Sequence, residues 1–274
     1  MTTEDILLDI TDGVARITLN RPDAGNSVTR EQRELLGTWL TRANEDPSIR
    51  CVVLGATGRF FCTGADLSGL ASEQAPADSG PEGAPERIVG DARRMMLTGA
   101  ITTMNAIIDC EKPVIAAVQG TAAGIGAHLA FACDLVIASD NAKFIEVFAR
   151  RGLAIDGLGS WMLPRLVGLQ RAKELVFLAD DISAQRGLEI GLVTRVVPAA
   201  ELDAAVGELA QRLADGPTRA HAVNKWLLNR SLDLDRATMA QEEAWVVEIM
   251  SGTLDSAEGV ASFLERRPPK FRGF

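Results

Sequence analysis

The segment from Val114 to Asp140, VIAAVQGTAAGIGAHLAFACDLVIASD, constrains the fold more than any other part of the chain. Its two apolar runs, VIAAV and DLVIAS, have the length of buried strands and leave room for a short helix between them. Between the runs, Gly120, Gly124 and Gly126 form a G-x-x-x-G-x-G pattern. We therefore expect an α/β fold in which a glycine loop and a helix start bring main-chain N–H groups close to a ligand.

The composition excludes several classes of partner. The chain has 274 residues, of which 37 are acidic and 28 basic, so its net charge is −9. Nucleic acids and anionic membranes require basic surfaces, and we expect neither as a partner. The start, MTTEDILLDI, lacks the basic and apolar regions of a signal peptide, and no run reaches the roughly 18 apolar residues of a membrane span. We expect a cytoplasmic protein of one or two domains.

The cysteines and histidines argue against a metal centre. Four cysteines stand far apart and form no C-x-x-C pair: Cys51, Cys62, Cys110 and Cys133. We expect them to be buried free thiols rather than disulfides or zinc ligands. The only histidines are His128 and His221, so a histidine-rich metal site is excluded and no bound metal is expected.

The first part of the chain has clear local signals. The runs ILLDI and VARITLN meet at Thr11-Asp12-Gly13, which predicts a hairpin. A helix is expected over 29–46, where Thr29 and Gln32 have the spacing of a capping box. The acidic segment 71–86, rich in Pro, Gly and Ala, is interpreted as a mobile surface loop.

The remaining elements divide the chain into two parts. Strands are expected at 51–56, 113–118, 134–139 and 194–197. Helices are expected at roughly 86–108, 125–132, 160–168, 170–179, 183–190, 199–214, 217–231, 235–250 and 256–266. The first two thirds are therefore an α/β layer structure and the last third is helical, with a boundary near 198–215.

One interpretation of the glycine loop is a dinucleotide site. A strand, a glycine turn, a helix and a second strand ending in Asp140 are the parts of a nucleotide-binding unit, and the spacing resembles that of short-chain dehydrogenases, which use NAD(P). That motif belongs after the first strand of its domain, whereas more than a hundred residues come first here. The family also needs a catalytic tyrosine, and this chain has none.

A second interpretation uses the same backbone atoms for a carbonyl oxygen. A glycine turn that opens a helix leaves unpaired N–H groups at the positive end of the helix dipole. The segment GRFFCTGADL (58–67) offers a second such turn, in which Gly64 allows close approach of a ligand. Two donors on one thioester carbonyl would form an oxyanion hole and stabilise an enolate.

Six segments in order along the chain carry a resemblance to one family. They are ITLNRPDAGNSVT, FFCTGADL, EKPVIAAVQGTAAGIGAHLAFACDLVIAS, GLGSWMLPRLVGLQRAKEL, AQRGLEIGLVTRVVP and EGVASFLERRPPKFRGF. Through them the chain resembles the enoyl-CoA hydratase/isomerase (crotonase) superfamily over essentially its whole length. The resemblance implies a spiral of ββα turns over 1–198 that carries an acyl-CoA site. It also implies a helical region over 199–274 that forms a homotrimer, or a hexamer as a dimer of trimers, and completes the coenzyme A site. Coenzyme A thioester is then the substrate, and no separate cofactor is expected.

The resemblance also assigns site residues. It places the two oxyanion donors on the backbone N–H groups of Ala65 and Ile125. Residues expected to contact the acyl-CoA are Gly64, Asp66, Leu67, Gly124 and Lys270. The tail RRPPKFR holds Arg266, Arg267, Lys270 and Arg272. It is either a solvated basic tail or a clamp for the coenzyme A phosphates, on its own or on a neighbouring subunit.

The chain departs from the family at both catalytic glutamates of its hydratases. Those positions are occupied by His128 and Phe148, and a phenylalanine transfers no proton. An acid at the position of Asp156 works as acid/base in relatives that shift double bonds, which favours isomerisation here. His128 is either an active-site donor or base or a packed core residue, and Asp156 alternatively serves as a turn or N-cap residue.

Other polar residues near the site have simpler interpretations. Glu146 would share a strand face with Phe148, but a surface or ion-pair role is expected for it. Arg150 and Arg151 are expected to stabilise the turn or an interface. Two further functions stay open: a hydratase with non-standard catalytic residues, and an acyl-CoA-binding homologue without turnover.

Overall fold

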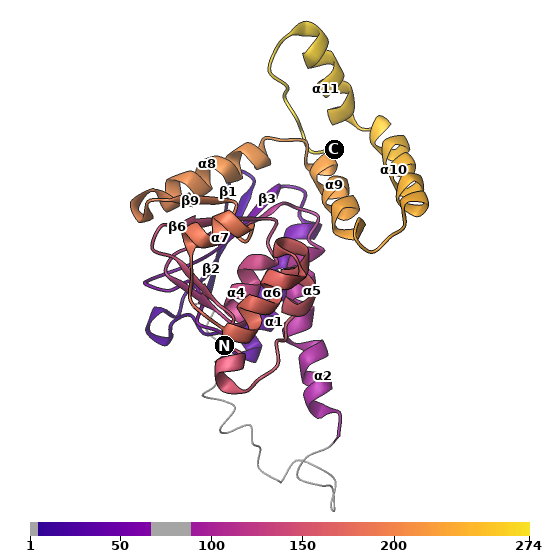
Figure 1. Ribbon diagram of the computed structural model, residues 1–274. Coiled ribbons are helices and arrows are strands. Elements are labelled where there is room, and N and C mark those ends of the chain that lie inside the picture. Colours follow the sequence, from indigo (N-terminus) through magenta and orange to yellow (C-terminus); the bar gives the residue numbers. More distant parts are fainter. Residues whose placement is uncertain (1–4, 67–88) are drawn as a thin grey trace, which may run out of the picture.

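The computed structural model describes residues 5–66 and 89–274 (Figure 1). Leu67 and the segment 71–86 lie outside these residues. The described chain is built around two mixed sheets with helices on both faces of the larger one, and its last two helices stand away from this core.

The larger sheet contains the strands that the sequence predicted. Its order is β1 (Ile6–Thr11), β2 (Val14–Leu19), β3 (Cys51–Ala56), β4 (Val114–Val118), β6 (Leu135–Ser139) and β9 (Arg195–Val197). The hairpin β1–β2 is antiparallel and turns at Asp12-Gly13, as expected, and all the other pairs are parallel. The carboxyl ends of β3 and β4 therefore lie side by side, and both glycine loops begin there.

A second, smaller sheet has no counterpart in the sequence predictions. It consists of β5 (Thr121–Ala123), β7 (Lys143–Ile145) and β8 (Ile182–Ser183). Two or three residues are too few to show an alternating pattern. This sheet holds the second glycine loop, because β5 follows β4 almost at once and pairs with β7.

The helices follow the predicted order. They are α1 (Arg30–Glu45), α2 (Asp91–Thr98), α3 (Ala100–Ile108), α4 (Ile125–Phe131), α5 (Gly159–Val167), α6 (Leu169–Leu178), α7 (Ala184–Ile190), α8 (Leu202–Ala214), α9 (Thr218–Arg230), α10 (Arg236–Ser251) and α11 (Leu254–Glu265). Both hydrogen bonds of the capping box at Thr29 and Gln32 are present.

The prediction of a single helix over 86–108 is wrong for residues 89–108, the part of this range that the structure describes. The chain forms α2 and α3 instead, because Gly99 adopts φ −108° and ψ −102°, outside the helical region. A Cβ on Gly99 would lie 2.7 Å from the carbonyl oxygen of Met95, so the bend depends on glycine. Glycine weakens a helix interior through its backbone entropy, and the periodicity of the flanking residues hides the break.

Two apolar clusters hold the layers together. The larger one fills the space between the sheet and helices such as α1, α3 and α4. The smaller one lies on the other face, where α8 buries Val206 and Ala210 against Val53 of β3 and Ile115 of β4. The predicted division at residue 198 stays a prediction; α8, just beyond it, is packed on the sheet.

All four cysteines are buried and free, as predicted. None of the helices in the described ranges has the length and apolarity of a membrane span.

The helices α10 and α11 expose apolar side chains that one chain leaves uncovered. Trp245 is 66% exposed and Phe263 is 82% exposed, and Val247, Ile249 and Leu264 are also largely exposed. Clusters of large exposed apolar side chains mark association surfaces. This surface therefore favours self-association, and the family resemblance implies a trimer, or a dimer of trimers, which we expect at micromolar concentration in sedimentation velocity. A monomer under these conditions would contradict the prediction.

Candidate active site

The first glycine loop is held in place by the segment Asn20–Asn26. Asn26 is buried, and its Nδ2 donates hydrogen bonds to the carbonyl oxygens of Thr57 and Phe60, at 2.8 and 2.7 Å. Its Oδ1 accepts from the backbone N–H of Arg21 at 2.8 Å. The two N–H groups of this amide thus hold the chain after β3, and its oxygen holds its own segment, which explains why an asparagine stands here.

Further bonds fix the end of the same loop. The guanidinium of Arg21 donates to Asp66 Oδ2 at 2.9 Å. The N–H of Val28 donates to Gly64 O, and the N–H of Asp66 donates to Val28 O. The carboxylate of Asp66, a residue expected to contact acyl-CoA, therefore supports the loop. These two bonds use Gly64 and Asp66, on either side of Ala65. The N–H of Ala65 itself donates to no backbone oxygen among the described residues.

The second glycine loop lies directly against the first. The N–H of Ala123 donates to Cys62 O at 2.9 Å, and the N–H of Cys62 donates to Thr121 O at 3.2 Å. A Cβ on Gly126 would lie 2.2 Å from Cys62 O, which no side chain permits. A Cβ on Gly64 would lie 3.2 Å from Ala123 O. The glycines therefore allow the two backbones to approach until their turns adjoin.

Both predicted oxyanion donors lie on these adjoining turns. Ile125 is the first residue of α4, where an N–H has no partner within the helix, and Gly124 before it has φ 53°. The loop follows the fourth strand of the chain rather than the first strand of its sheet, a placement that the dinucleotide interpretation does not fit. Two main-chain donors on adjoining turns can polarise one carbonyl oxygen.

His128 is one turn further along α4 and is completely buried. Its Nε2 lies 3.0 Å from Oε2 of Glu146, and its ring stacks on Phe148 with centroids 5.5 Å apart. Its Nδ1 has no hydrogen-bond partner among the described residues. His128 is therefore packed and hydrogen-bonded, as one of its two interpretations required, and it also adjoins the first residues of α4.

Asp156 lies on the turn before α5, and this turn packs on the ring of His128. A Cβ on Gly159 would lie 2.3 Å from the ring, and one on Gly157 would lie 3.4 Å from Nδ1. Leu158, between these glycines, adopts the left-handed region at φ 62°, a sparsely populated conformation for a non-glycine residue. The turn is held tightly against α4 at some cost in backbone strain.

The carboxyl group of Asp156 is partly buried. Its Oδ1 is shielded from solvent and has no hydrogen-bond partner among the described residues. Burial raises the pKa of Asp156, and the positive charge of Arg33 opposes this shift. The N-cap interpretation is wrong: Leu158 precedes α5, and no side chain caps that helix. A partly buried carboxyl without a structural partner is suited to acid/base chemistry.

Glu146 is the residue of this region whose position sequence reasoning missed. A surface or ion-pair role was expected, but its carboxyl is buried and bonded to His128. The surface half of that expectation is wrong, and the polar partner of Glu146 is His128. The available signal was that Glu146 stands two residues before Phe148, which occupies the position of a missing glutamate. Both do contact His128.

Neighbouring reactive groups have structural roles. Cys62 lies in the first loop, but burial raises the pKa of its thiol to about 12, so it is no nucleophile at neutral pH. Arg150 donates to Asp181 at 2.9 Å across the turn, as expected of a stabilising residue. Arg151 is exposed.

The basic tail lies at the opposite end of the sheet from the two loops. Arg50, directly before β3, donates to the carbonyl oxygen of Phe271 at 3.4 Å, whereas the first loop follows the other end of β3. Six strand residues span roughly 20 Å. Lys270 thus lies about one strand length from its own chain's proposed donors, and its predicted contact with acyl-CoA stays a prediction. Arg267 is engaged within the chain by Glu258 and Glu265.

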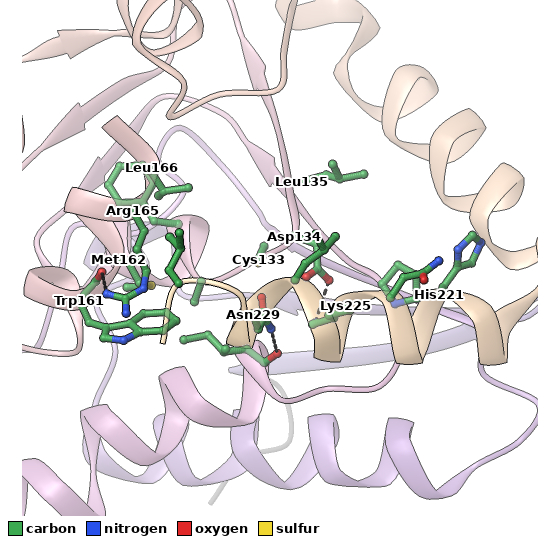
Figure 2. A pocket seen from close by; sticks show the side chains of 17 residues that line it. Cys133, Asp134, Leu135, Trp161, Met162, Arg165, Leu166, His221, Lys225 and Asn229 are labelled. Atoms are coloured by element: carbon green, nitrogen blue, oxygen red, sulfur yellow. Dashed lines mark hydrogen bonds and ion pairs between the residues drawn. The ribbon is translucent and has the colours of Figure 1, made fainter. Parts of the chain in front are cut away.

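A cavity of about 470 Å³ lies at the other end of α4, between that helix, α5 and α9 (Figure 2). Inside it, Lys225 donates to Asp134 Oδ2 at 2.8 Å, and Asp134 also accepts from the N–H of Val114. Arg165 lies over the ring of Trp161, 4.0 Å from its centroid. Lys225 and Asp134 are paired within the chain and fasten α9 to the core, so we assign this pair to docking rather than to the reaction.

Comparisons with known proteins agree with this geometry. Residues 9–273 match the family described as enoyl-CoA hydratase/isomerase. The chain is 36% identical to a probable enoyl-CoA hydratase of Rhodobacter capsulatus, over 100% of both chains. It is 35% identical to 1,2-epoxyphenylacetyl-CoA isomerase of Escherichia coli, over 98% of this chain and 99% of that one. The crystal structure of a putative enoyl-CoA hydratase from Streptomyces coelicolor superposes with a TM-score of 0.89 at 35% identity, covering 98% of this chain and 94% of that one.

Proposed function

The chain belongs to the enoyl-CoA hydratase/isomerase family, and from this premise we propose that it shifts the double bond of an enoyl-CoA thioester, with Asp156 as acid/base. The observation that carries the proposal is the contrast between two side chains. Asp156 presents a buried carboxyl oxygen without a structural partner, while Phe148 occupies the position of a hydratase glutamate and stacks on His128. One carboxyl is enough to move a proton, whereas hydration must also activate a water molecule.

The proposed reaction begins at the adjoining turns. The thioester carbonyl oxygen accepts hydrogen bonds from the N–H groups of Ala65 and Ile125, which stabilises negative charge on that oxygen. The carboxylate of Asp156 removes a proton from C2 of a 3-enoyl-CoA, and the electron pair delocalises into a dienolate. Asp156 then returns the proton to C4, which leaves the double bond between C2 and C3. The site ends in its starting protonation state.

A second candidate function is hydration with non-standard residues. The observation in its favour is the bonded pair of His128 and Glu146 beside the turn of Asp156, because it supplies a second group able to handle protons. The relatives' names include both a hydratase and an isomerase, so they support the shared chemistry of the thioester rather than either reaction.

Deuterated water separates the two functions. With a 2-enoyl- or 3-enoyl-CoA as substrate, isomerisation incorporates deuterium at C2 or C4 while little 3-hydroxyacyl-CoA accumulates. We expect exchange to be faster than hydration, as measured by mass spectrometry of the acyl chain together with chromatography of the products. Rapid accumulation of 3-hydroxyacyl-CoA without label at C4 would favour the hydratase instead.

A further inference from the structure

Glu146 and His128 form a buried pair that the proposed reaction does not use directly. The side chain of Glu146 is 5% exposed and that of His128 is 0% exposed, and 3.0 Å separates Oε2 from Nε2. Polar side chains are rarely buried this deeply unless they are bonded to each other. The pair joins α4 to the chain just after β7, two segments that are 18 residues apart.

The histidine ring is held on three sides. Glu146 bonds Nε2 at one edge, and Phe148 lies along one face at an interplanar angle of 17°. The turn of Gly157 and Gly159 lies against the ring atoms, including Nδ1. The ring therefore has a single orientation, in which Nδ1 adjoins the turn that carries Asp156.

The position of His128 on α4 also brings it toward the proposed oxyanion hole. Residues three apart share a helix face, so His128 lies on the face of Ile125. Helical side chains lean toward the amino end of their helix, which is the end where the N–H of Ile125 lies. A Cβ on Gly157 would contact both the Ile125 side chain and Nδ1, at 3.4 Å each.

We propose that Glu146 is a positioning residue, which accepts a hydrogen bond from Nε2–H of His128 and so leaves Nδ1 as the proton-accepting atom beside Asp156. A neutral imidazole has one donor and one acceptor nitrogen, and the bond made by one decides the role of the other. Nδ1 then accepts a hydrogen bond from Asp156 while that carboxyl carries the proton between C2 and C4. The kinetic part of this inference rests on the proposed function; the tautomer of His128 does not.

The tautomer is measurable without any substrate. The chain has only two histidines, so nitrogen-15 labelling of histidine gives two imidazole signal sets, and His221→Gln assigns them. In the wild type we expect the imidazole of His128 to carry its proton on Nε2 and none on Nδ1. Protonation at Nδ1 with a bare Nε2 would overturn the proposal, whether or not the protein isomerises any acyl-CoA.

Two substitutions test the role of Glu146. Glu146→Leu keeps a side chain of similar size but removes the acceptor for Nε2–H of His128. The two tautomers should then mix. The kcat for deuterium exchange should fall about tenfold, while KM changes less than about twofold. Glu146→Gln keeps an acceptor oxygen and should retain the tautomer and restore most of kcat. Glu189→Gln, on an exposed part of α7, serves as the matched control and should equal the wild type.

The outcomes are distinguishable. A folded Glu146→Leu variant with the wild-type tautomer and kcat would remove any positioning role. If that variant does not fold, as judged by circular dichroism, the tautomer of the wild type and of Glu146→Gln decides the question. Absence of exchange in the wild type, with the expected tautomer, would contradict the isomerase function and leave the hydrogen-bond assignment intact.

Discussion

Asp156→Asn is expected to lower the rate of proton exchange on the acyl chain by about 10²–10⁴-fold, because the amide cannot accept the proton. The substitution keeps the shape of the side chain, and no hydrogen bond of the described residues depends on Oδ1. Coenzyme A affinity should therefore be nearly unchanged, which isothermal titration calorimetry can measure alongside the exchange rate.

The pH dependence should follow the same carboxyl group. Burial raises the pKa of Asp156, and a base acts only in its ionised form. The value of kcat/KM should therefore fall, as the pH is lowered, at a higher pH than an ordinary aspartate would cause. Asp156→Asn should lose this dependence along with the activity.

His128→Gln is the comparison for this experiment. It should reduce exchange less than Asp156→Asn, because the histidine assists the proton transfer and Asp156 performs it. Rapid hydration that survives Asp156→Asn but disappears with His128→Gln would make His128 the working base and would replace the isomerase proposal.

Ala65→Pro is expected to reduce turnover by about 10²–10³-fold, because proline has no N–H and one oxyanion donor is lost. The substitution removes no backbone hydrogen bond among the described residues, because the hydrogen bonds to Val28 are made by the neighbouring Gly64 and Asp66. The measurement is kcat on an enoyl-CoA, together with a thermal melt that establishes folding.

Ala65→Ser provides the matched control because it changes the side chain and keeps the N–H. Its turnover should stay within a few-fold of the wild type. Wild-type turnover in a folded Ala65→Pro variant would refute the assignment of this donor.

The sequence predicted most of the helices and long strands because each carries its own local signal. Asp12-Gly13 marked the hairpin, and Thr29 with Gln32 marked the start of α1. The break at Gly99 depends on a contact with the carbonyl oxygen of Met95, and flanking helical periodicity concealed it. The small sheet was missed because its strands are held by pairing between distant segments rather than by any pattern of their own.

The candidate site was also predicted only in part. The proposed oxyanion donors and Asp156 were predicted from motifs and the family resemblance, and the structure brings the loops of Ala65 and Ile125 together. The burial of Glu146 was not predicted because it depends on how the chain turns after Ile145. An alternating strand argument fails there, since the strand ends at that residue.

The hydrogen bonds from Asn26 to the first glycine loop have a consequence for how substitutions can change the reaction of this enzyme. The proposed carbonyl-binding groups are main-chain atoms, and their placement depends on Asn26, Arg21 and the glycines, while proton transfer depends on side chains of α4 and the turn before α5. Point mutations at positions 128, 148 and 156 can therefore exchange one reaction for another without moving the thioester. Grafting carboxylates in place of His128 and Phe148 is therefore the corresponding route toward hydration for an engineer.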